Sequence, residues 1–196
     1  MRRFLALLLA VICLVSAAAA EADWRFEMDG AQWGMAGADI ALLMGVSVEE
    51  ILPVRVSGDE NDAVQVPLDL LDVWDREIYG CDADVSYVFA DDELRMLVYD
   101  MVPDADDVDA VRAGLTAEYG EPQQEFERLY GVMDAFIPGM YTEDSFAGAD
   151  CWELPDGTLL YFVNYANKMV AHSDNQYVMC GMDYAGMAAA LGIAVE

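Results

Sequence analysis

The clearest pattern in the chain is a regular alternation of apolar and polar residues over positions 81–89. The apolar members fall on one face of an extended chain: Cys81, Ala83, Val85, Tyr87 and Phe89. A period of two residues is typical of a half-buried β-strand. The acidic turn at residues 90–93 and the apolar segment at 94–101 then predict a hairpin with a returning strand.

A second hairpin is predicted at Asp156-Gly157, because this dipeptide joins two apolar segments at 151–154 and 158–165. Asp-Gly is a strong hairpin sequence, since both residues tolerate the positive φ that a tight two-residue turn requires. Residues 166–168 predict another turn, and a further strand is expected from Met169.

Helical periodicity is strongest over residues 105–119, where Val108, Val111 and Leu115 form an apolar stripe. Several aspartates precede or occupy the first turn, where their charge suits the positive end of the helix dipole. Gly120 is placed to end this helix.

A shorter helical pattern near the N-terminus carries Ile40, Leu43 and Met44 on one face, with Gly45 placed to end it. A serine and a glutamate three residues apart follow at residues 47–50. Their spacing matches a capping box and predicts another helical turn.

Four segments are less regular. Residues 57–63 are polar and predict a loop, whereas residues 67–78 fit a helix or a strand. Residues 123–149 are rich in glycine, proline and aromatic residues and predict irregular structure. Residues 179–195 are rich in Met and Ala, and they fit either a short helix docked on the core or an adaptable contact surface.

Together these elements predict an α+β fold, in which antiparallel β hairpins or a meander pack against a few short helices. The chain length suits a single domain over residues 21–196. A description as two loosely similar halves, about 24–104 and 105–196, is also open, because acidic turns join apolar strands in both.

The first twenty residues have the pattern of a secretory signal peptide. Two arginines precede an unbroken apolar run at residues 4–15, and small residues follow as far as Ala20. We therefore expect cleavage near Ala20, which places the mature chain in the periplasm or at the cell surface. The remaining sequence has no apolar run of the roughly 20 residues that a membrane-spanning helix needs.

The chain of 196 residues is strongly acidic, with 37 Asp+Glu against 9 Lys+Arg and a formal net charge of −28. This charge argues against nucleic acid and anionic membrane surfaces, both of which attract Lys and Arg. The apolar content of 56% argues against general disorder. We expect a monomer whose partner is a protein or a small ligand.

Three cysteines follow the predicted signal peptide: Cys81, Cys151 and Cys180. Export would permit one structural disulfide, for which Cys81 and Cys151 are the favoured pair. The alternative is three buried thiols. Three separated cysteines and a single histidine do not form a zinc motif.

Candidate chemistry is sparse. The acidic groups at residues 59–62 and 104–107 supply oxygen ligands of the type that calcium prefers, although neither has EF-hand spacing. The sequence His172-Ser173-Asp174 contains triad residue types, but neighbours in sequence do not make a triad, and a polar turn is the simpler interpretation. Paired carboxylates are too abundant to indicate a glycosidase. The tryptophans, among them Trp33 and Trp152, fit a sugar-stacking platform or the core.

Several short motifs resemble a family of small exported bacterial proteins of unknown function, which carry a W-G-M-S-x-x-E-V-like sequence near the mature N-terminus. Here that sequence is Trp33-Gly34-Met35 followed by Asp39-Ile40, with Ala36 in place of the usual helix-capping Ser. Later correspondences are a Gly-led strand at 80–89, a returning strand at 94–101, the sequence Tyr-Gly-Glu-Pro at 119–122 and a Trp-containing strand pair at 152–165. A more distant resemblance is to small outer-membrane-assembly lipoproteins and β-lactamase-inhibitor-like folds, which are binding modules.

The sequence thus predicts an exported, acidic, non-catalytic binding or interaction protein, with no catalytic, binding or metal residue assigned. A calcium-stabilised extracytoplasmic protein is the first alternative. A hydrolase that depends on carboxylates is the second.

Overall fold

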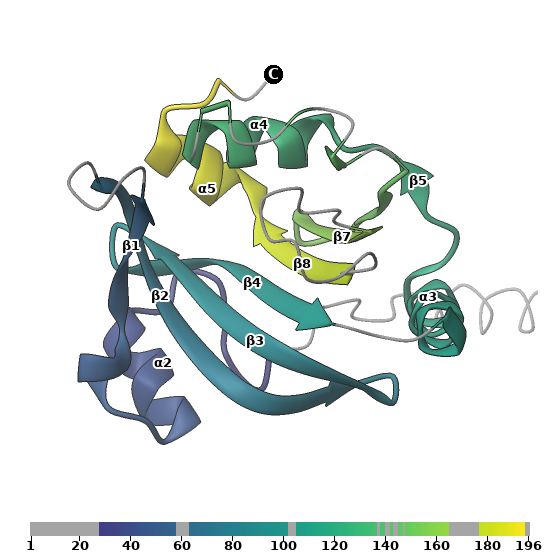
Figure 1. The fold of residues 1–196 in the computed structure, drawn as a ribbon, viewed down its shortest axis with the longest axis horizontal. Coiled ribbons are helices and arrows are strands. Elements are labelled where there is room, and N and C mark those ends of the chain that lie inside the picture. The colour runs from purple at the N-terminus through teal and green to yellow at the C-terminus, as the bar shows by residue number, and fades with distance from the viewer. Residues whose placement is uncertain are drawn as a thin grey trace, which may run out of the picture.

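The protein is built on one antiparallel sheet (Figure 1), seen here in a computed structural model that describes residues 28–57, 63–101, 105–136, 138–139, 142, 145–146, 148–164 and 177–194. The sheet has eight strands in the order β1-β2-β3-β4-β8-β7-β6-β5, and every neighbouring pair is antiparallel. The strands are β1 (Leu52–Ser57), β2 (Ala63–Ile78), β3 (Cys81–Ala90), β4 (Glu93–Met101), β5 (Gln123–Gln124), β6 (Asp150–Glu153), β7 (Thr158–Asn164) and β8 (Tyr177–Asp183).

The strand order divides the sheet into two meanders, β1 to β4 and β5 to β8, which meet where β4 pairs with β8. The antiparallel α+β architecture predicted from the sequence is therefore confirmed. A relation between the two halves of the sequence stays a prediction.

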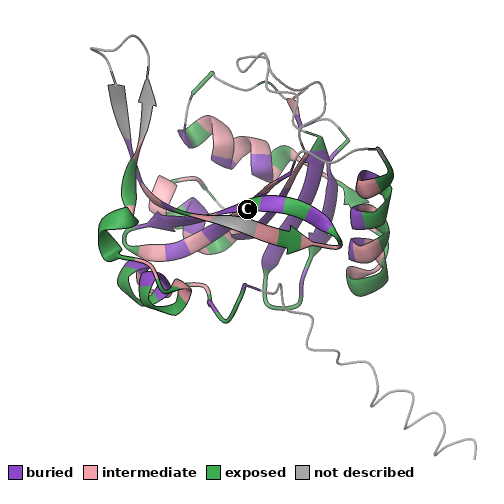
Figure 2. Cartoon of the chain, turned by 60° about the horizontal axis from the view of Figure 1, so that its bottom comes forward, coloured by how far each residue is buried: buried purple, intermediate pink, exposed green. Residues whose placement is uncertain are grey.

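Helices cover both faces of the sheet. They are α2 (Gly37–Met44), the 3-10 helix η1 (Val48–Glu50), α3 (Ala105–Tyr119), α4 (Glu127–Phe136) and α5 (Tyr184–Leu191). The helices α2 and α3 pack on one face in the first hydrophobic cluster, and α4 and α5 pack on the other face in the second. Figure 2 shows the buried residues concentrated in the strands between these layers. No helix among the described residues is long and apolar enough to cross a membrane.

The predicted hairpin at residues 81–101 is confirmed. Alternate residues of β3 are buried from Cys81 onward, as the period-two pattern requires. Asp91 and Asp92 form the turn with φ of 53° and 64°, the pair of positive values found in turns that match the strand twist. The hairpin predicted at Asp156-Gly157 between β6 and β7 is confirmed as well, but its turn is not the tight two-residue type. Gly157 has a φ of 86°, whereas Asp156 has no positive φ, and the Gly157 N–H donates to the Leu154 carbonyl at 2.9 Å.

The two helices with the clearest sequence patterns also form. In α3, Val108, Val111 and Leu115 are all buried, as predicted. The helix α2 ends at Gly45, whose φ is 72°, but Leu43 is 45% exposed rather than in the core.

A residue from another element accepts the hydrogen bond of a backbone N–H at the start of α2. Its N-cap residue is Ala36, which has no side-chain hydrogen-bond acceptor. Instead, the Gly37 N–H donates to Oδ1 of Asp92 in the β3–β4 turn, at 3.3 Å. The predicted capping box between Ser47 and Glu50 is present at η1. A long-range contact thus replaces the local cap that the sequence lacks at Ala36.

The ambiguous segment 67–78 is a strand, the second part of β2. Pro67 is tolerated there because the pairing with β1 shifts register between Pro53 and Arg55, so that residues 66–68 of β2 form a bulge opposite Val54. Proline lacks the N–H that a regular ladder needs, so bulges are among the few sheet positions that accept it. Of the loop predicted at 57–63, Ser57 ends β1 and Ala63 begins β2, while residues 58–62 lie outside the described residues.

Two predictions for the C-terminal half are wrong in part. Residues 123–149 are not irregular throughout, because they include β5 and α4. The predicted C-terminal helix exists as α5, but residues 179–183 belong to β8, a central strand. The turn at 166–168 and the strand from Met169 lie outside the described residues.

The proposed disulfide between Cys81 and Cys151 is wrong. Both residues are buried free thiols, as is Cys180. Cys81 belongs to the cluster under α2 and α3, whereas Cys151 belongs to the cluster under α4 and α5. The sheet itself therefore separates the two sulfur atoms.

Candidate apolar groove

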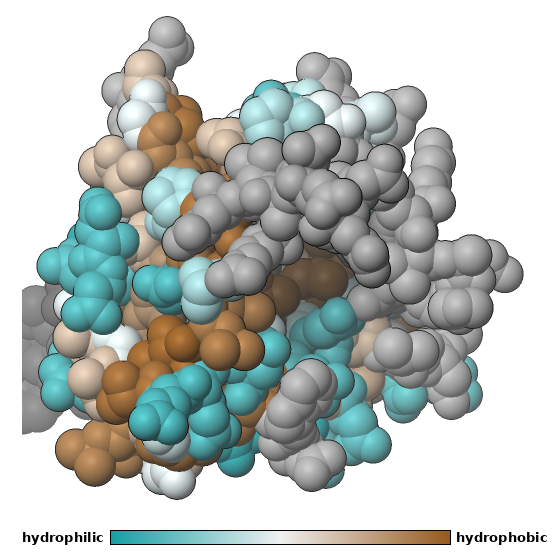
Figure 3. All heavy atoms as spheres, turned by 60° about the vertical axis from the view of Figure 1, so that its left-hand side comes forward, coloured by the Kyte–Doolittle hydropathy of each residue, from teal (hydrophilic) through white to brown (hydrophobic). Residues whose placement is uncertain are grey.

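A cavity of about 310 Å³ lies between the sheet and α4, and its described lining is almost entirely apolar. We call it the apolar groove. Its floor comes from β1, β2, β3, β4, β7 and β8, and its roof from α4 and Phe146. In Figure 3, apolar side chains gather along the side of the molecule that carries β1 and β2 and continue into a recess, with hydrophilic side chains beside it.

The register of the strands fixes the positions of the side chains on the floor of the groove. One row runs across the sheet through Leu70, Val88 and Met96. A second row begins two residues further along β4, at Val98, which lies opposite Cys180 of β8. Side chains on one face of a strand recur every second residue, so these rows all point at α4.

The roof is a narrow apolar stripe on α4. Leu129, Met133 and Phe136 line the groove, at spacings of four and three residues that place them on one face of a helix. Leu129 and Phe136 are buried, whereas Met133 is half-buried because it faces the open part of the groove.

Among the described residues, the helical cover of this face is incomplete. Val98 and Val178 lie in the central strands β4 and β8, yet both are only half-buried. No described helix therefore covers this part of the floor completely.

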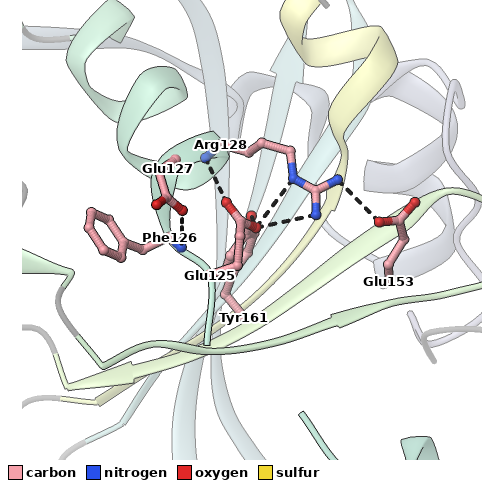
Figure 4. A network of polar contacts seen from close by, with 6 residues as sticks. All are labelled: Glu125, Phe126, Glu127, Arg128, Glu153 and Tyr161. Carbon is pink, nitrogen blue, oxygen red and sulfur yellow. Dashed lines mark hydrogen bonds and ion pairs between the residues drawn. The ribbon is translucent and has the colours of Figure 1, made fainter. Parts of the chain in front are cut away.

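A polar network holds the N-terminal end of α4 against the sheet (Figure 4). Oε2 of Glu125 accepts a hydrogen bond from the Tyr161 hydroxyl at 2.8 Å and another from Nε of Arg128 at 3.2 Å. Oε1 of Glu125 accepts from the backbone N–H of Arg128 at 3.0 Å. Arg128 also reaches Glu153 of β6 at 3.3 Å. The roof of the groove is therefore tied to β7 through Glu125 and to β6 through Arg128 and Glu153.

The electrostatics of this network favour an ionised Glu125. Burial alone would raise the pKa of this carboxyl, but the hydrogen bonds from Arg128 and Tyr161 and the charge of Arg128 outweigh it and lower the pKa. Burial, reinforced by the neighbouring Cys151 and Glu125, raises the pKa of Tyr161 well above its usual range. The hydroxyl of Tyr161 therefore remains a donor and does not act as a base.

Ordinary nucleophilic catalysis has little support in or near the groove. Burial raises the pKa of the Cys180 thiol to about 12. Burial, with the Glu125 carboxylate adding to it, raises the pKa of Cys151 to about 12 as well. A thiol attacks as the thiolate, and at neutral pH these two stay protonated. Among the described residues that line the groove, Asp100 is the sole carboxylic acid.

The candidate calcium ligands do not come together in the described part of the chain. Asp106 and Asp107 open α3, while residues 58–62 and Asp104 are not described. No group of three or more His, Cys, Asp or Glu side chains among the described residues could hold a metal ion. His172-Ser173-Asp174 lies outside the described residues.

The two tryptophans whose side chains are described, Trp33 and Trp152, pack against the sheet and do not form a sugar-stacking platform. Nε1 of Trp33 donates to Oγ1 of Thr158 at 2.7 Å, and Nε1 of Trp152 donates to the Gly120 carbonyl at 2.7 Å. Trp152 is buried and Trp33 is half-buried. Each ring thereby fixes a turn or a helix end to the sheet.

The sequence interpretation missed the groove because it missed α4. A usable pattern was present, since Leu129, Val132, Met133 and Phe136 follow the i, i+3, i+4, i+7 spacing of an amphipathic helix. The floor was harder to predict, because it depends on which strands become neighbours.

The chain matches no protein-family model, and comparison with curated proteins and with solved structures yields no match either. Its function is therefore inferred from the geometry of the groove.

Proposed function

We propose that this protein is a non-catalytic binding protein that takes a small apolar ligand into the apolar groove. The observation that carries the proposal is the cavity of about 310 Å³, whose described lining is aliphatic or aromatic apart from Asp100 and the Cys180 thiol. Ligand pockets have volumes of roughly 300–1,000 Å³ and are lined mainly by apolar groups with a few polar ones.

The arrangement of the two faces supports binding rather than incomplete packing. The face under α2 and α3 is also covered by residues 28–35, which pack in the first cluster. The face under α4 and α5 leaves valines of central strands half-buried. An exposed apolar patch on a folded protein commonly marks an interaction site.

The proposed site of action is outside the cytoplasm. The support is the signal-peptide pattern of residues 1–20 and the resemblance of the Trp33-Gly34-Met35 region to exported proteins. The distant resemblance to β-lactamase-inhibitor-like binding modules points the same way. A hydrolase that uses two carboxylates is less well supported, because only Asp100 lines the groove among the described residues.

The proposal can be tested by titrating the purified protein with N-phenyl-1-naphthylamine, a neutral dye that fluoresces in apolar surroundings. We expect saturable binding by the wild type and a loss of at least about fivefold in affinity for Val98→Phe, which fills the groove from its floor. The matched control is Val73→Phe, because Val73 is also a half-buried strand valine but packs on the opposite face.

A second variant, Met133→Trp, fills the groove from α4. It keeps the test possible if Val98→Phe does not fold. Thermal melting of each variant checks that the fold is retained. Equal dye affinity in the wild type, Val98→Phe and Met133→Trp proteins would refute binding in the groove.

A further inference from the structure

We infer that the ligand of the apolar groove is one long hydrocarbon chain, as in a fatty alcohol or a single-chain lipid, which lies diagonally across the strands. This inference rests on the proposed function and adds the shape and the chemical class of the ligand. It follows from the path that the groove takes over the sheet.

The groove is long for its volume. Its lining comes from six neighbouring strands, β1, β2, β3, β4, β8 and β7. Steps of about 4.8 Å from each strand to the next give a path of roughly 24 Å along the sheet. A compact cavity of the same volume, about 310 Å³, would reach side chains from only about three or four such strands. The shape therefore suits an extended ligand.

The path of the groove is diagonal. In one row of the strand register, the lining residue on β3 is Val88. In the next row, two residues along the strands, the lining residues are Val98 and Cys180. In the row after that, Val178 and Val163 line the groove on β8 and β7. The lining thus moves along the strands as it passes from one strand to the next.

The described side chains on either side of this diagonal do not belong to the lining. On β3, Ser86 and Asp84 share the face of the lining residue, but they are polar and do not line the groove. On β7, Leu159 and Tyr161 share the face of the lining residue, but both are fully covered by other parts of the protein. A wide ring system would leave the apolar path on one side or clash on the other, whereas a single chain can follow it.

The chemistry of the lining favours a ligand without polar groups along its length. Among the described lining residues, the polar groups are the Asp100 carboxylate and the Cys180 thiol. The strands of the floor hydrogen-bond to one another, so their backbone has few free partners for a bound peptide. An extended peptide would bury its own N–H and C=O groups without partners, which is unfavourable. A hydrocarbon chain carries no such groups.

One end of the groove reaches the edge of the sheet. Among the described strands, β1 pairs with β2 alone, and its lining residue Val54 is half-buried. Leu52 of β1 lies opposite the lining residue Leu70 and is 61% exposed. The apolar side chains on this side of the molecule continue into the recess in Figure 3. A chain can therefore enter the groove lengthwise from this edge.

The first test compares two uncharged probes with equal numbers of carbon atoms and different shapes, dodecanol and cyclododecanol. Each displaces N-phenyl-1-naphthylamine from the wild-type protein, and each affinity is divided by the octanol–water partition coefficient of the probe. We expect dodecanol to bind at least about tenfold more tightly on this scale, because the wide ring must displace packed side chains. From octanol to tetradecanol, affinity should rise by up to about fourfold for each added CH₂ group.

The decisive variants block one end of the groove at a time. Val178→Phe fills the end beside β7, and Val54→Phe fills the end at β1, where each native valine is half-buried. Each variant should remove most of the gain in affinity from octanol to tetradecanol, because the long chain no longer fits. Octanol should stay within about threefold of its wild-type affinity, since it needs only part of the path. The matched control, Val73→Phe on the opposite face, should leave the whole series unchanged.

A further probe distinguishes two sources of the chain. Lysophosphatidylcholine with one tetradecanoyl chain is used below its critical micelle concentration. Displacement of the dye by this lipid, with the same sensitivity to Val178→Phe as tetradecanol, would support a lipid tail as the ligand. Displacement by tetradecanol alone would support a free chain with a small head group.

The outcomes separate the two proposals. If dodecanol and cyclododecanol bind equally well on the partition scale, the inference about shape is wrong while the proposed function stands. An equal loss at every chain length in both Val178→Phe and Val54→Phe would also overturn the inference. If neither the dye nor any alcohol binds to the wild type, both proposals are wrong. A wild-type dimer that Val98→Phe makes monomeric would assign the groove to a second copy of the chain instead.

Discussion

The aromatic ring of Tyr79 lies directly on Gly114 of α3 and leaves no room there for a side chain. A Cβ atom at Gly114 would be 2.8 Å from Cγ of Tyr79 and closer still to Cδ1 and Cε1. Tyr79 belongs to the β2–β3 turn, with φ of 50°. This glycine therefore sets how closely α3 approaches the end of the sheet.

The replacement Gly114→Ala should lower the free energy of unfolding by about 1–3 kcal/mol, because the added methyl group forces the Tyr79 ring or α3 to move. Gly131→Ala in α4 should act in the opposite direction and raise it by up to about 1 kcal/mol, since helices favour Ala over Gly. A Cβ at Gly131 would meet no atom within 4 Å. Urea unfolding of both variants measures the difference, and equal effects of the two replacements would contradict the packing described here.

Removal of the Glu125 carboxylate should destabilise the protein in a pH-dependent manner. Glu125→Gln weakens the bonds from Tyr161 and Arg128, which we expect to cost about 1–3 kcal/mol near pH 7. Because folding lowers the pKa of Glu125 from its usual 4.5, the stabilisation is complete above that pH and disappears as the pH falls through the folded-state value.

The measurement is the free energy of unfolding of the wild type and of Glu125→Gln between pH 7 and pH 3. The difference between them should shrink below about pH 4.5. Glu121→Gln is the control, because Glu121 is exposed and its replacement removes the same charge. A difference that stays constant with pH would show that Glu125 is not ionised in the folded protein.

The three buried cysteines should be unreactive in the folded protein. Burial raises the pKa of Cys151 and of Cys180 to about 12, so that very little thiolate exists at pH 8. In a Cys13→Ser chain, Ellman's reagent should modify none of the three without denaturant and all three in guanidinium chloride. The intact mass of the protein should match three free thiols. A mass lower by two hydrogen atoms would reveal a disulfide.

Asp183 should stabilise α5 in two separable ways. Its Oδ1 accepts from the Gly186 N–H at 3.0 Å as an N-cap, and its Oδ2 pairs with Arg95 at 2.6 Å. Asp183→Asn retains an N-capping residue and loses the ion pair, whereas Asp183→Ala loses both. We expect Asp183→Ala to cost about 1 kcal/mol more than Asp183→Asn in thermal or urea unfolding. Equal losses would mean that the cap contributes nothing.

Local features of the fold could be predicted from the sequence. The alternation over residues 81–89, the Asp156-Gly157 hairpin and the stripe of α3 all depend on neighbours within a few residues. Each of these predictions holds because propensity, burial pattern and turn chemistry agree there.

Long-range features could not be predicted. The segment Val178-Met179-Cys180 is apolar on both faces because β8 is central, and such a run does not distinguish a strand from a buried helix. The capping of α2 by Asp92 depends on a residue 55 positions from Gly37. The groove itself requires β4 and β8 to become neighbours, and no local pattern specifies that pairing.

The pairing of β4 with β8 has a consequence for the order of folding. The strands β1 to β4 form ladders between sequence neighbours, but the centre of the sheet closes only when residues 177–183 arrive from near the end of the chain. Contacts between distant segments form slowly, because the entropy of loop closure is lost before they stabilise anything. Until β8 is in place, β4 and β7 both present unpaired edges, the kind of surface on which chains associate. Of the strands in this sheet, β8 comes last in sequence, and its arrival is what protects the edges of the two meanders from aggregation.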